Sequence, residues 1–134
     1  MIYRWFVRRA ALTGWRRLSD HRVADLPIAD DVHFVFLGDH ALAADLYGAD
    51  ALRGWLNELF TRFPRLRFEV EDMISEGGPW STRVATRYDA IQDGQLVYRG
   101  VSFARIVWGK VAEERIQPDT LLLAAALVGS AVSD

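Results

Sequence analysis

The side chains best suited to moving protons in this chain are a few carboxylates and one histidine. Asp119 directly precedes a leucine-rich run, and Asp39 and His40 lie together in a segment bounded by glycines. Burial in an apolar pocket raises the pKa of a carboxyl group toward neutral pH, and an imidazole already titrates there, so both suit acid–base catalysis. Asp119 and His40 are therefore the predicted catalytic residues. Further candidates are Asp39, Asp31 and, if the last strand turns that face inward, Glu114.

Structural roles compete with these chemical ones. The Asp119-Thr120 pair before an apolar run is typical of a helix N-cap, and capping is the explanation we prefer for Asp119. Asp31 also fits the entry to a strand, and His33 alternates with two phenylalanines, so it should face away from a pocket. No two of the three histidines have metal-ligand spacing, and the sequence has no phosphate-binding glycine motif or nucleophile elbow. We predict no metal and no cofactor.

Length and composition predict one domain spanning residues 1–134. The chain lies within the usual range of roughly 100 to 200 residues for one domain, and 51% of its residues are hydrophobic. It has no cysteine, which excludes a disulfide-stapled secreted scaffold and is compatible with the cytoplasmic location that we predict. The basic residues are arginine with one exception, Lys110, a bias in coding composition that weakly favours a bacterial source.

The first twenty residues carry five arginines and a single acid, Asp20. Such a basic start is compatible with a transit peptide or a membrane-surface helix. We favour the buried stripe of a first globular helix, which its apolar residues also fit: Ile2, Trp5, Phe6, Leu12, Trp15 and Leu18. The longest apolar run, residues 121–129, is short of the ~20 residues that a membrane span needs. Beyond the first helix no sustained basic patch is present. We predict neither a membrane nor a nucleic-acid partner.

Apolar periodicity predicts helices first and an antiparallel meander last, which is an α+β arrangement. The glycine-bounded segment 38–48 is predicted to be a loop, and Asp50 is predicted to cap the helix after it. The predicted helices span residues 3–19, 20–24, 50–63 and 119–127, and the predicted strands span residues 32–37, 65–71, 80–89, 95–108 and 111–117.

One face of the long strand at 95–108 predicts a pocket. Gly100, Ser102 and Ala104 leave room on that face, between Tyr98 and Trp108. Tyrosine and tryptophan suit a pocket wall because they combine a large apolar ring with one polar atom. The predicted ligand-binding residues are Trp15, Phe36, Trp80, Tyr88, Tyr98 and Ser102.

The order of elements, the tight turn Trp108-Gly109-Lys110 and the terminal sequence DTLLLAAAL resemble the nuclear transport factor 2-like superfamily, in its SnoaL-like and ketosteroid-isomerase-like branch. The resemblance covers nearly the whole chain, including ADDVHFVF and GKVAEERIQPD. It implies a cone-shaped fold, a cystatin-like α+β roll, in which a curved antiparallel sheet wraps around the N-terminal helices and encloses a mostly apolar cavity. It also implies a homodimer.

The functional residues of the isomerases do not carry over. Their aspartate base falls at Phe36, the acid of their oxyanion hole near Ser102, and their first-helix tyrosine near Thr13. The resemblance to SnoaL-type cyclases instead places a carboxylate at Asp119. We therefore predict a protein that binds a small hydrophobic ligand, either as a proton-transfer enzyme (an isomerase, cyclase or hydrolase acting on a cyclic or aromatic substrate) or as a non-catalytic binding or dimerisation module of the same fold. The sequence leaves open whether it is an enzyme.

Overall fold

The computed structural model describes residues 2–132, with side chains from residue 5 to residue 129. In chain order the elements are α1 (Ile2–Ser19), the short 3-10 helix η1 (Val23–Asp25), β1 (Ile28–Phe36), β2 (Ala44–Tyr47), α2 (Ala49–Arg62), β3 (Arg67–Gly78), β4 (Ser81–Gln92), β5 (Gln95–Val107), β6 (Lys110–Pro118) and α3 (Thr120–Val132).

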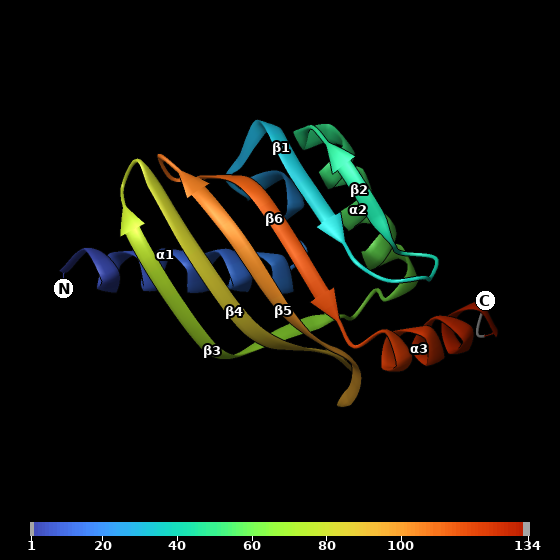
Figure 1. Ribbon diagram of the computed structural model, residues 1–134. Helices are drawn as coiled ribbons and strands as arrows, with labels where there is room; N and C mark the ends of the chain where they lie inside the picture. Colours follow the sequence, from blue (N-terminus) through green and yellow to red (C-terminus); the bar gives the residue numbers. More distant parts are fainter. Residues whose placement is uncertain (1, 133–134) are drawn as a thin grey trace.

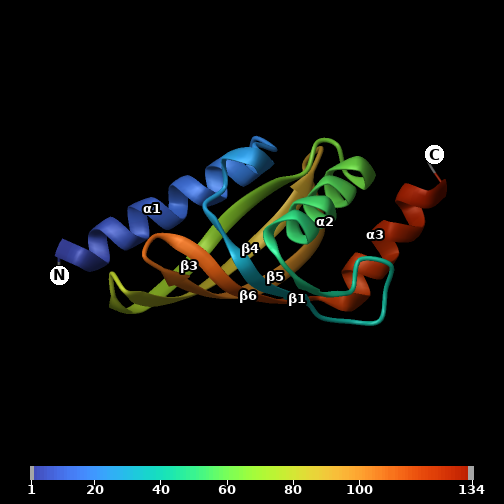
Figure 2. The same ribbon diagram turned by 90° about the horizontal axis from the view of Figure 1, so that it is seen from above.

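The strands form one curved sheet in the order β2-β1-β6-β5-β4-β3 (Figure 1). Helices α1 and α2 lie on the same face of this sheet, its inner face, and α3 lies beyond the end of β6 (Figure 2). This arrangement confirms the predicted α+β class, with a curved sheet against the first helices. Four of the five strand pairings are antiparallel, and the pairing of β1 with β6 is parallel, which the sequence pattern did not predict.

The core lies between α2 and the inner face of the sheet. Trp55 packs its ring against Phe34 and Phe36 at centroid distances of 4.7 and 4.8 Å. Its indole N–H donates a hydrogen bond of 2.9 Å to the carbonyl of Leu42, so its one polar atom is satisfied although the side chain is buried. These contacts fix α2 against β1 and close one end of the space under the sheet.

Helix ends show where local prediction succeeds and where it fails. At α3, Asp119 Oδ1 accepts a hydrogen bond of 3.2 Å from the N–H of Leu122, which confirms the predicted cap. At α2 the predicted cap is wrong, because Gly48 occupies the N-cap position with a φ of 101° and no side chain caps the helix. Asp50 lies instead in the first turn, where its charge still suits the helix dipole.

Two further segments differ from prediction. The predicted loop at 38–48 contains strand β2, which pairs with the outer edge of β1. The first helix buries only part of its apolar stripe: Trp15 and Leu18 pack against the core, but Trp5 and Phe6 are exposed at its beginning. No helix among the described residues is long and apolar enough to cross a membrane.

Candidate functional site

A cavity of about 440 Å³ lies between the inner face of the sheet and helices α1 and α2. Its walls are mostly apolar. Buried residues from the middle of α2 and of strands β4, β5 and β6 form its inner wall. Its exposed lining residues gather at one end, where α1 begins and where β3 turns into β4 and β5 turns into β6. They are Phe6, Ala10, Pro27, Pro79, Trp108 and Gly109. The cavity therefore has a closed end and an open mouth.

Glu114 places a carboxyl group in this apolar wall. It lies on β6 between Ala104 of β5 and Phe34 of β1, its partners in the two neighbouring strands. The hydroxyl of Ser102 donates a hydrogen bond of 2.7 Å to Glu114 Oε1. The side chain is partly buried and lines the cavity. Burial raises the pKa of Glu114 above its ordinary value, and the Ser102 hydrogen bond opposes part of that rise.

Two tyrosines form a second polar pair in the cavity. The hydroxyls of Tyr88 and Tyr98 lie 2.8 Å apart, and each side chain is only 1% exposed. Burial raises the pKa of both hydroxyls, and the nearby Glu114 carboxylate raises them further. Both hydroxyls are therefore protonated at neutral pH and can act as hydrogen-bond donors.

Glycine at position 100 makes room for this pair. Gly100 faces Tyr88 across the β4–β5 ladder. A Cβ atom on Gly100 would lie 3.2 Å from the Tyr88 hydroxyl and ring, which is tighter than an ordinary contact. The missing side chain thus lets the Tyr88 ring cross β5 and reach Tyr98. The small residues of β5 provide this space, as the sequence suggested for the pocket floor.

Four of the six predicted ligand-binding residues line the cavity: Trp15, Tyr88, Tyr98 and Ser102. The other two do not. Phe36 is 1% exposed and is packed within the core behind the wall, and Trp80 is 62% exposed on the outside of the β3–β4 turn. Alternation correctly places Phe36 on the inner face but does not say which side chains the helices cover, and Trp80 lies in the turn before β4, where strand alternation does not apply.

The two predicted catalytic residues lie outside the cavity. Asp119 is exposed and caps α3. The ring of His40 is held by the backbone, since its Nδ1 accepts from the N–H of Leu42 at 3.2 Å and its Nε2 lies 3.0 Å from the carbonyl of Leu37. Both ring nitrogens are thus occupied in bracing the loop before β2. Neither Asp31 nor Asp39 lines the cavity either, and both are exposed.

Glu114 is the carboxylate that the structure brings into the cavity, and a bulge explains why its position is hard to predict. Pairing along β5 and β6 steps from Arg105–Glu113 to Ile106–Val111, which leaves Ala112 extra on β6. An extra residue reverses the inward and outward alternation. As a result Val111 and Glu114, three residues apart, both line the cavity. From the sequence, Glu114 is therefore a candidate only on the condition that the last strand turns that face inward, and the structure shows that it does.

Comparison with known proteins agrees with this architecture. The SnoaL-like domain family matches residues 9–114. The chain belongs to the SnoaL-like domain family. This match and the structural neighbours confirm the superfamily resemblance. No curated protein sequence matches the chain.

Several solved structures share the fold of this SnoaL-like domain at low sequence identity. Bal32a from a soil-derived mobile gene cassette has a TM-score of 0.70 at 12% identity, covering 89% of this chain and 92% of its own. Wild-type IdmH from Streptomyces antibioticus, described as a putative polyketide cyclase, has a TM-score of 0.68 at 17% identity, covering 91% and 97%. A putative isomerase of the SnoaL-like family from Agrobacterium tumefaciens has a TM-score of 0.60 at 19% identity, covering 89% and 99%.

Within the described part of this SnoaL-like domain, no group of three or more histidine and carboxylate side chains is placed to hold a metal ion. The ionisable groups that the cavity offers are Glu114 and the two tyrosines.

Proposed function

We propose that this protein holds a small apolar, ring-bearing ligand in its cavity and that Glu114 exchanges a proton with that ligand. The observation that supports the proposal is a single carboxyl group, hydrogen-bonded to Ser102, in a mostly apolar chamber. A raised pKa brings such a group closer to working pH, where it donates a proton when neutral and accepts one when ionised. The reaction would then be an isomerisation, a cyclisation or another step that begins with proton transfer.

The remaining polar groups would orient the ligand. Tyr98 and Tyr88 present hydroxyls in the same chamber as Glu114, and a ligand oxygen near them could accept a hydrogen bond. Donors held in place in a site that excludes water stabilise negative charge as it develops on an oxygen. Two structural neighbours, one described as a putative polyketide cyclase and one as a putative isomerase, support this reaction class, although those descriptions belong to those proteins.

A second candidate function is binding without catalysis. It is favoured by the way in which the cavity's polar groups satisfy one another: Ser102 bonds Glu114, and Tyr88 bonds Tyr98. No buried side-chain nitrogen or oxygen atom among the described residues lacks a hydrogen-bond partner. An apolar ligand would then fill the chamber without disturbing either pair.

Proton exchange on a generic carbon acid separates the two functions. The methyl protons of aromatic methyl ketones, beginning with 2-acetylnaphthalene, exchange for deuterium in D₂O, and proton NMR follows the rate. We expect the protein to accelerate exchange. In Glu114→Gln the rate of protein-catalysed exchange should fall by about 10²- to 10⁴-fold. Asp119→Asn is the matched control and should keep it.

Two other outcomes are informative. Saturable binding of the ketones without faster exchange would contradict catalysis and support the binding module. Equal exchange by the wild type and Glu114→Gln would contradict the role of Glu114. The homodimer, the cytoplasmic location and the bacterial source stay predictions from the sequence.

A further inference from the structure

Exposed aromatic side chains lie at and beside the mouth of the cavity: Phe6 and Trp108 line it, the Trp5 ring lies 5.1 Å from that of Phe6, and Trp80 follows Pro79, which also lines it. Trp5 and Phe6 lie on the first turns of α1, Trp80 in the β3–β4 turn and Trp108 in the β5–β6 turn. Their exposed fractions are 55%, 57%, 62% and 71%. The N–H of Trp108 donates a hydrogen bond of 3.1 Å to the carbonyl of Pro79, which holds the two turns together. We call these four residues the aromatic rim.

Trp108 occupies a backbone conformation that disfavours a bulky residue. Two hairpins in this protein have two-residue turns with positive φ at both positions: Asp93-Gly94 (54° and 76°) and Trp108-Gly109 (48° and 81°). The first has the Asp-Gly sequence that such turns prefer. The second has tryptophan at the same position, although a bulky residue with positive φ is uncommon and strained. Trp108 is thus both strained and exposed, and neither feature benefits the folded chain by itself.

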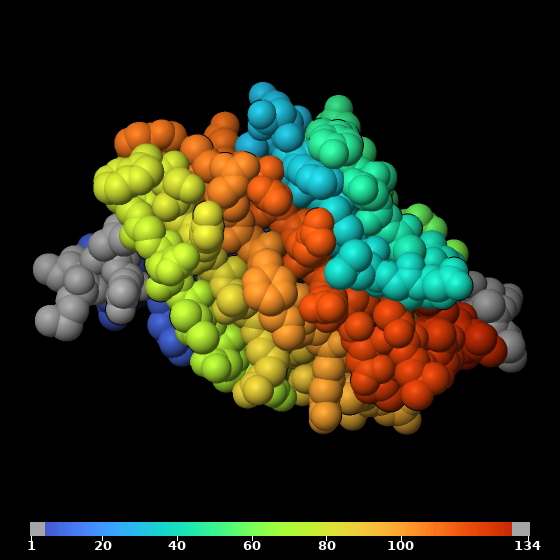
Figure 3. Space-filling model, viewed as in Figure 1, coloured from blue at the N-terminus to red at the C-terminus, as the bar shows by residue number. Residues whose placement is uncertain are grey.

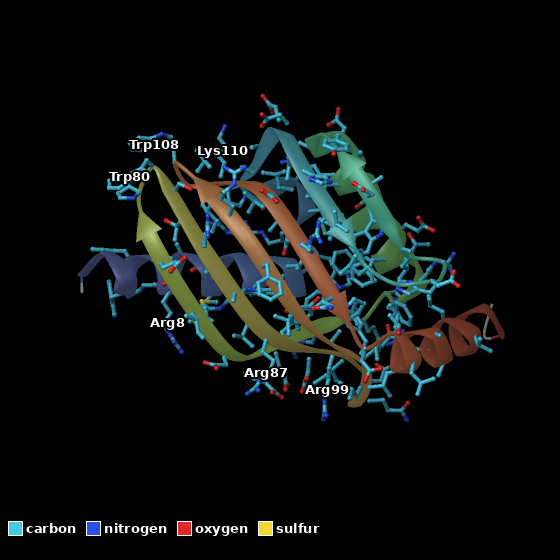
Figure 4. The ribbon with its side chains drawn as sticks, in the orientation of Figure 1. Arg8, Trp80, Arg87, Arg99, Trp108 and Lys110 are labelled. Atoms are coloured by element: carbon cyan, nitrogen blue, oxygen red, sulfur yellow. The ribbon has the colours of Figure 1, made fainter. Side chains whose placement is uncertain are left out.

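Basic residues lie next to two parts of the rim, the start of α1 and the Trp108 turn. Arg8 and Arg9 follow Phe6 on α1, with the Arg9 guanidinium 5.3 Å from the centre of the Trp5 ring, and Lys110 follows the Trp108 turn. Figure 4 shows Trp80, Trp108 and Lys110 together at one end of the sheet, whereas the Arg8 side chain points away from them on the other side of α1. Residues 5–19 include no acid. Glu76, near the Trp80 turn, pairs with Arg83 at 3.9 Å.

We propose that the mouth of the cavity binds the surface of an anionic lipid bilayer, with the aromatic rim at the level of the headgroups. Tryptophan prefers the interface between water and membrane because its ring is apolar and its N–H is polar. Arginine and lysine beside such rings add attraction to anionic headgroups. The sequence alone predicts no membrane partner, and the gathering of distant aromatic and basic residues at the mouth changes that expectation.

A bilayer fits this surface better than a protein partner does. The rim consists of separate projections around an opening, on a helix and two turns, and not of one flat apolar patch. The opening leads directly into the apolar cavity. On a membrane, an apolar ligand would pass from the lipid into the cavity without crossing water. That last step rests on the proposed function, whereas membrane binding itself does not.

Vesicle co-sedimentation tests the proposal with the full chain. The probes are vesicles of phosphatidylcholine alone and of phosphatidylcholine mixed with phosphatidylglycerol. We expect the protein to sediment with the mixed vesicles, to bind less at higher salt, and to stay in solution with phosphatidylcholine alone. Replacing Lys110 by Gln should weaken binding about fivefold, the effect of one basic residue near an anionic surface.

Trp108→Asn separates a binding role from a structural one. Asparagine tolerates positive φ, so the variant should keep its fold and raise the Tm by a few degrees. It should nevertheless bind mixed vesicles about tenfold more weakly, because a large ring no longer inserts. Leu121→Ser is the matched control: Leu121 is 82% exposed on α3, away from the mouth, and its loss should leave vesicle binding unchanged.

Three results of the vesicle assay would overturn the proposal. They are no sedimentation with either kind of vesicle, equal binding by the wild type and Trp108→Asn, and equal losses for Trp108→Asn and Leu121→Ser. If Trp108→Asn instead lowers the molecular mass of the protein in lipid-free sedimentation, the rim is an interface between copies of this chain, and the membrane proposal is wrong. The ketone exchange assay in lipid-free buffer tests the proposed function separately.

Discussion

Glu114 and Asp119 are carboxylates five residues apart: Glu114 lies within β6, and Asp119 directly follows the strand. Their surroundings differ in every respect that matters for chemistry. Glu114 lies in the wall of an apolar cavity, beside Phe34, with its pKa raised by burial. Asp119 is exposed and its carboxylate caps α3. It borders a shallow surface hollow together with Arg99. Figure 3 shows α3 and the end of β6 at the surface of the molecule.

The comparison teaches that environment, and not residue type or family position, selects the candidate acid. The family resemblance points to Asp119 for a cyclase and to position 102 for the acid of an isomerase. Here position 102 is a serine, and its hydroxyl contacts the carboxyl group of Glu114 on the neighbouring strand. The cavity therefore has an acid next to position 102, where the isomerase resemblance places one. The acid comes from β6, whereas position 102 lies on β5.

The largest effect on stability is expected from breaking the polar pair near Glu114. Tyr98→Phe removes one hydroxyl and leaves that of Tyr88 without its partner in a buried site. We expect a loss of about 1–3 kcal/mol in the free energy of unfolding, measured by urea denaturation. The same change on the surface, Tyr47→Phe, should have little effect, because Tyr47 is 71% exposed. Equal losses in the free energy of unfolding for the two variants would show that removing a hydroxyl from the cavity costs no more than removing one from the surface.

A smaller effect is expected at Asp119. Asp119→Ala removes the cap of α3 and should cost about 1 kcal/mol of the free energy of unfolding. Asp119→Asn keeps a capping oxygen and should cost less. Thermal or urea denaturation of the two variants measures the difference. If both variants are as stable as the wild type, the hydrogen bond to Leu122 does not stabilise the helix.

Much of the fold follows from local patterns. The three-and-four spacing of Leu52, Trp55, Leu56 and Leu59 predicts α2, and the Asp93-Gly94 pair predicts its hairpin. The parallel pairing of β1 with β6 is different, because it joins segments that are distant in sequence and have no pattern specific to each other. Strand β2 is only four residues long and lies between glycine-flanked turns, so its composition looks like that of a loop.

The site is less predictable than the fold. Alternation along β4 and β5 correctly places Tyr88, Tyr98 and Ser102 on one face, because both strands keep their register there. Glu114 depends on the bulge in β6, which one sequence does not reveal. Apolar periodicity in α1 also cannot distinguish a buried ring such as Trp15 from a ring at the open mouth such as Phe6, since both satisfy the same spacing.

The raised pKa of Glu114 has a definite consequence for stability. A carboxyl group whose pKa is higher in the folded state than in the unfolded state binds its proton more tightly when folded. Its contribution to stability is therefore complete below the unfolded pKa of about 4.3 and is lost as the pH rises through the folded pKa. Relative to Glu114→Gln, which does not titrate, the wild type should lose stability by up to about 1.4 kcal/mol for each pH unit in that window.

Titration of the Glu114 carboxyl carbon by ¹³C NMR tests the central claim most directly, with the signal assigned by its absence in Glu114→Gln. Burial in the apolar cavity predicts a midpoint above the ordinary value of about 4.3 for glutamate. It also predicts a still higher midpoint in Ser102→Ala, because the Ser102 hydrogen bond lowers the pKa of Glu114. A midpoint at or below the ordinary value would show a solvated carboxylate and would contradict the assignment of Glu114 as the acid of the cavity.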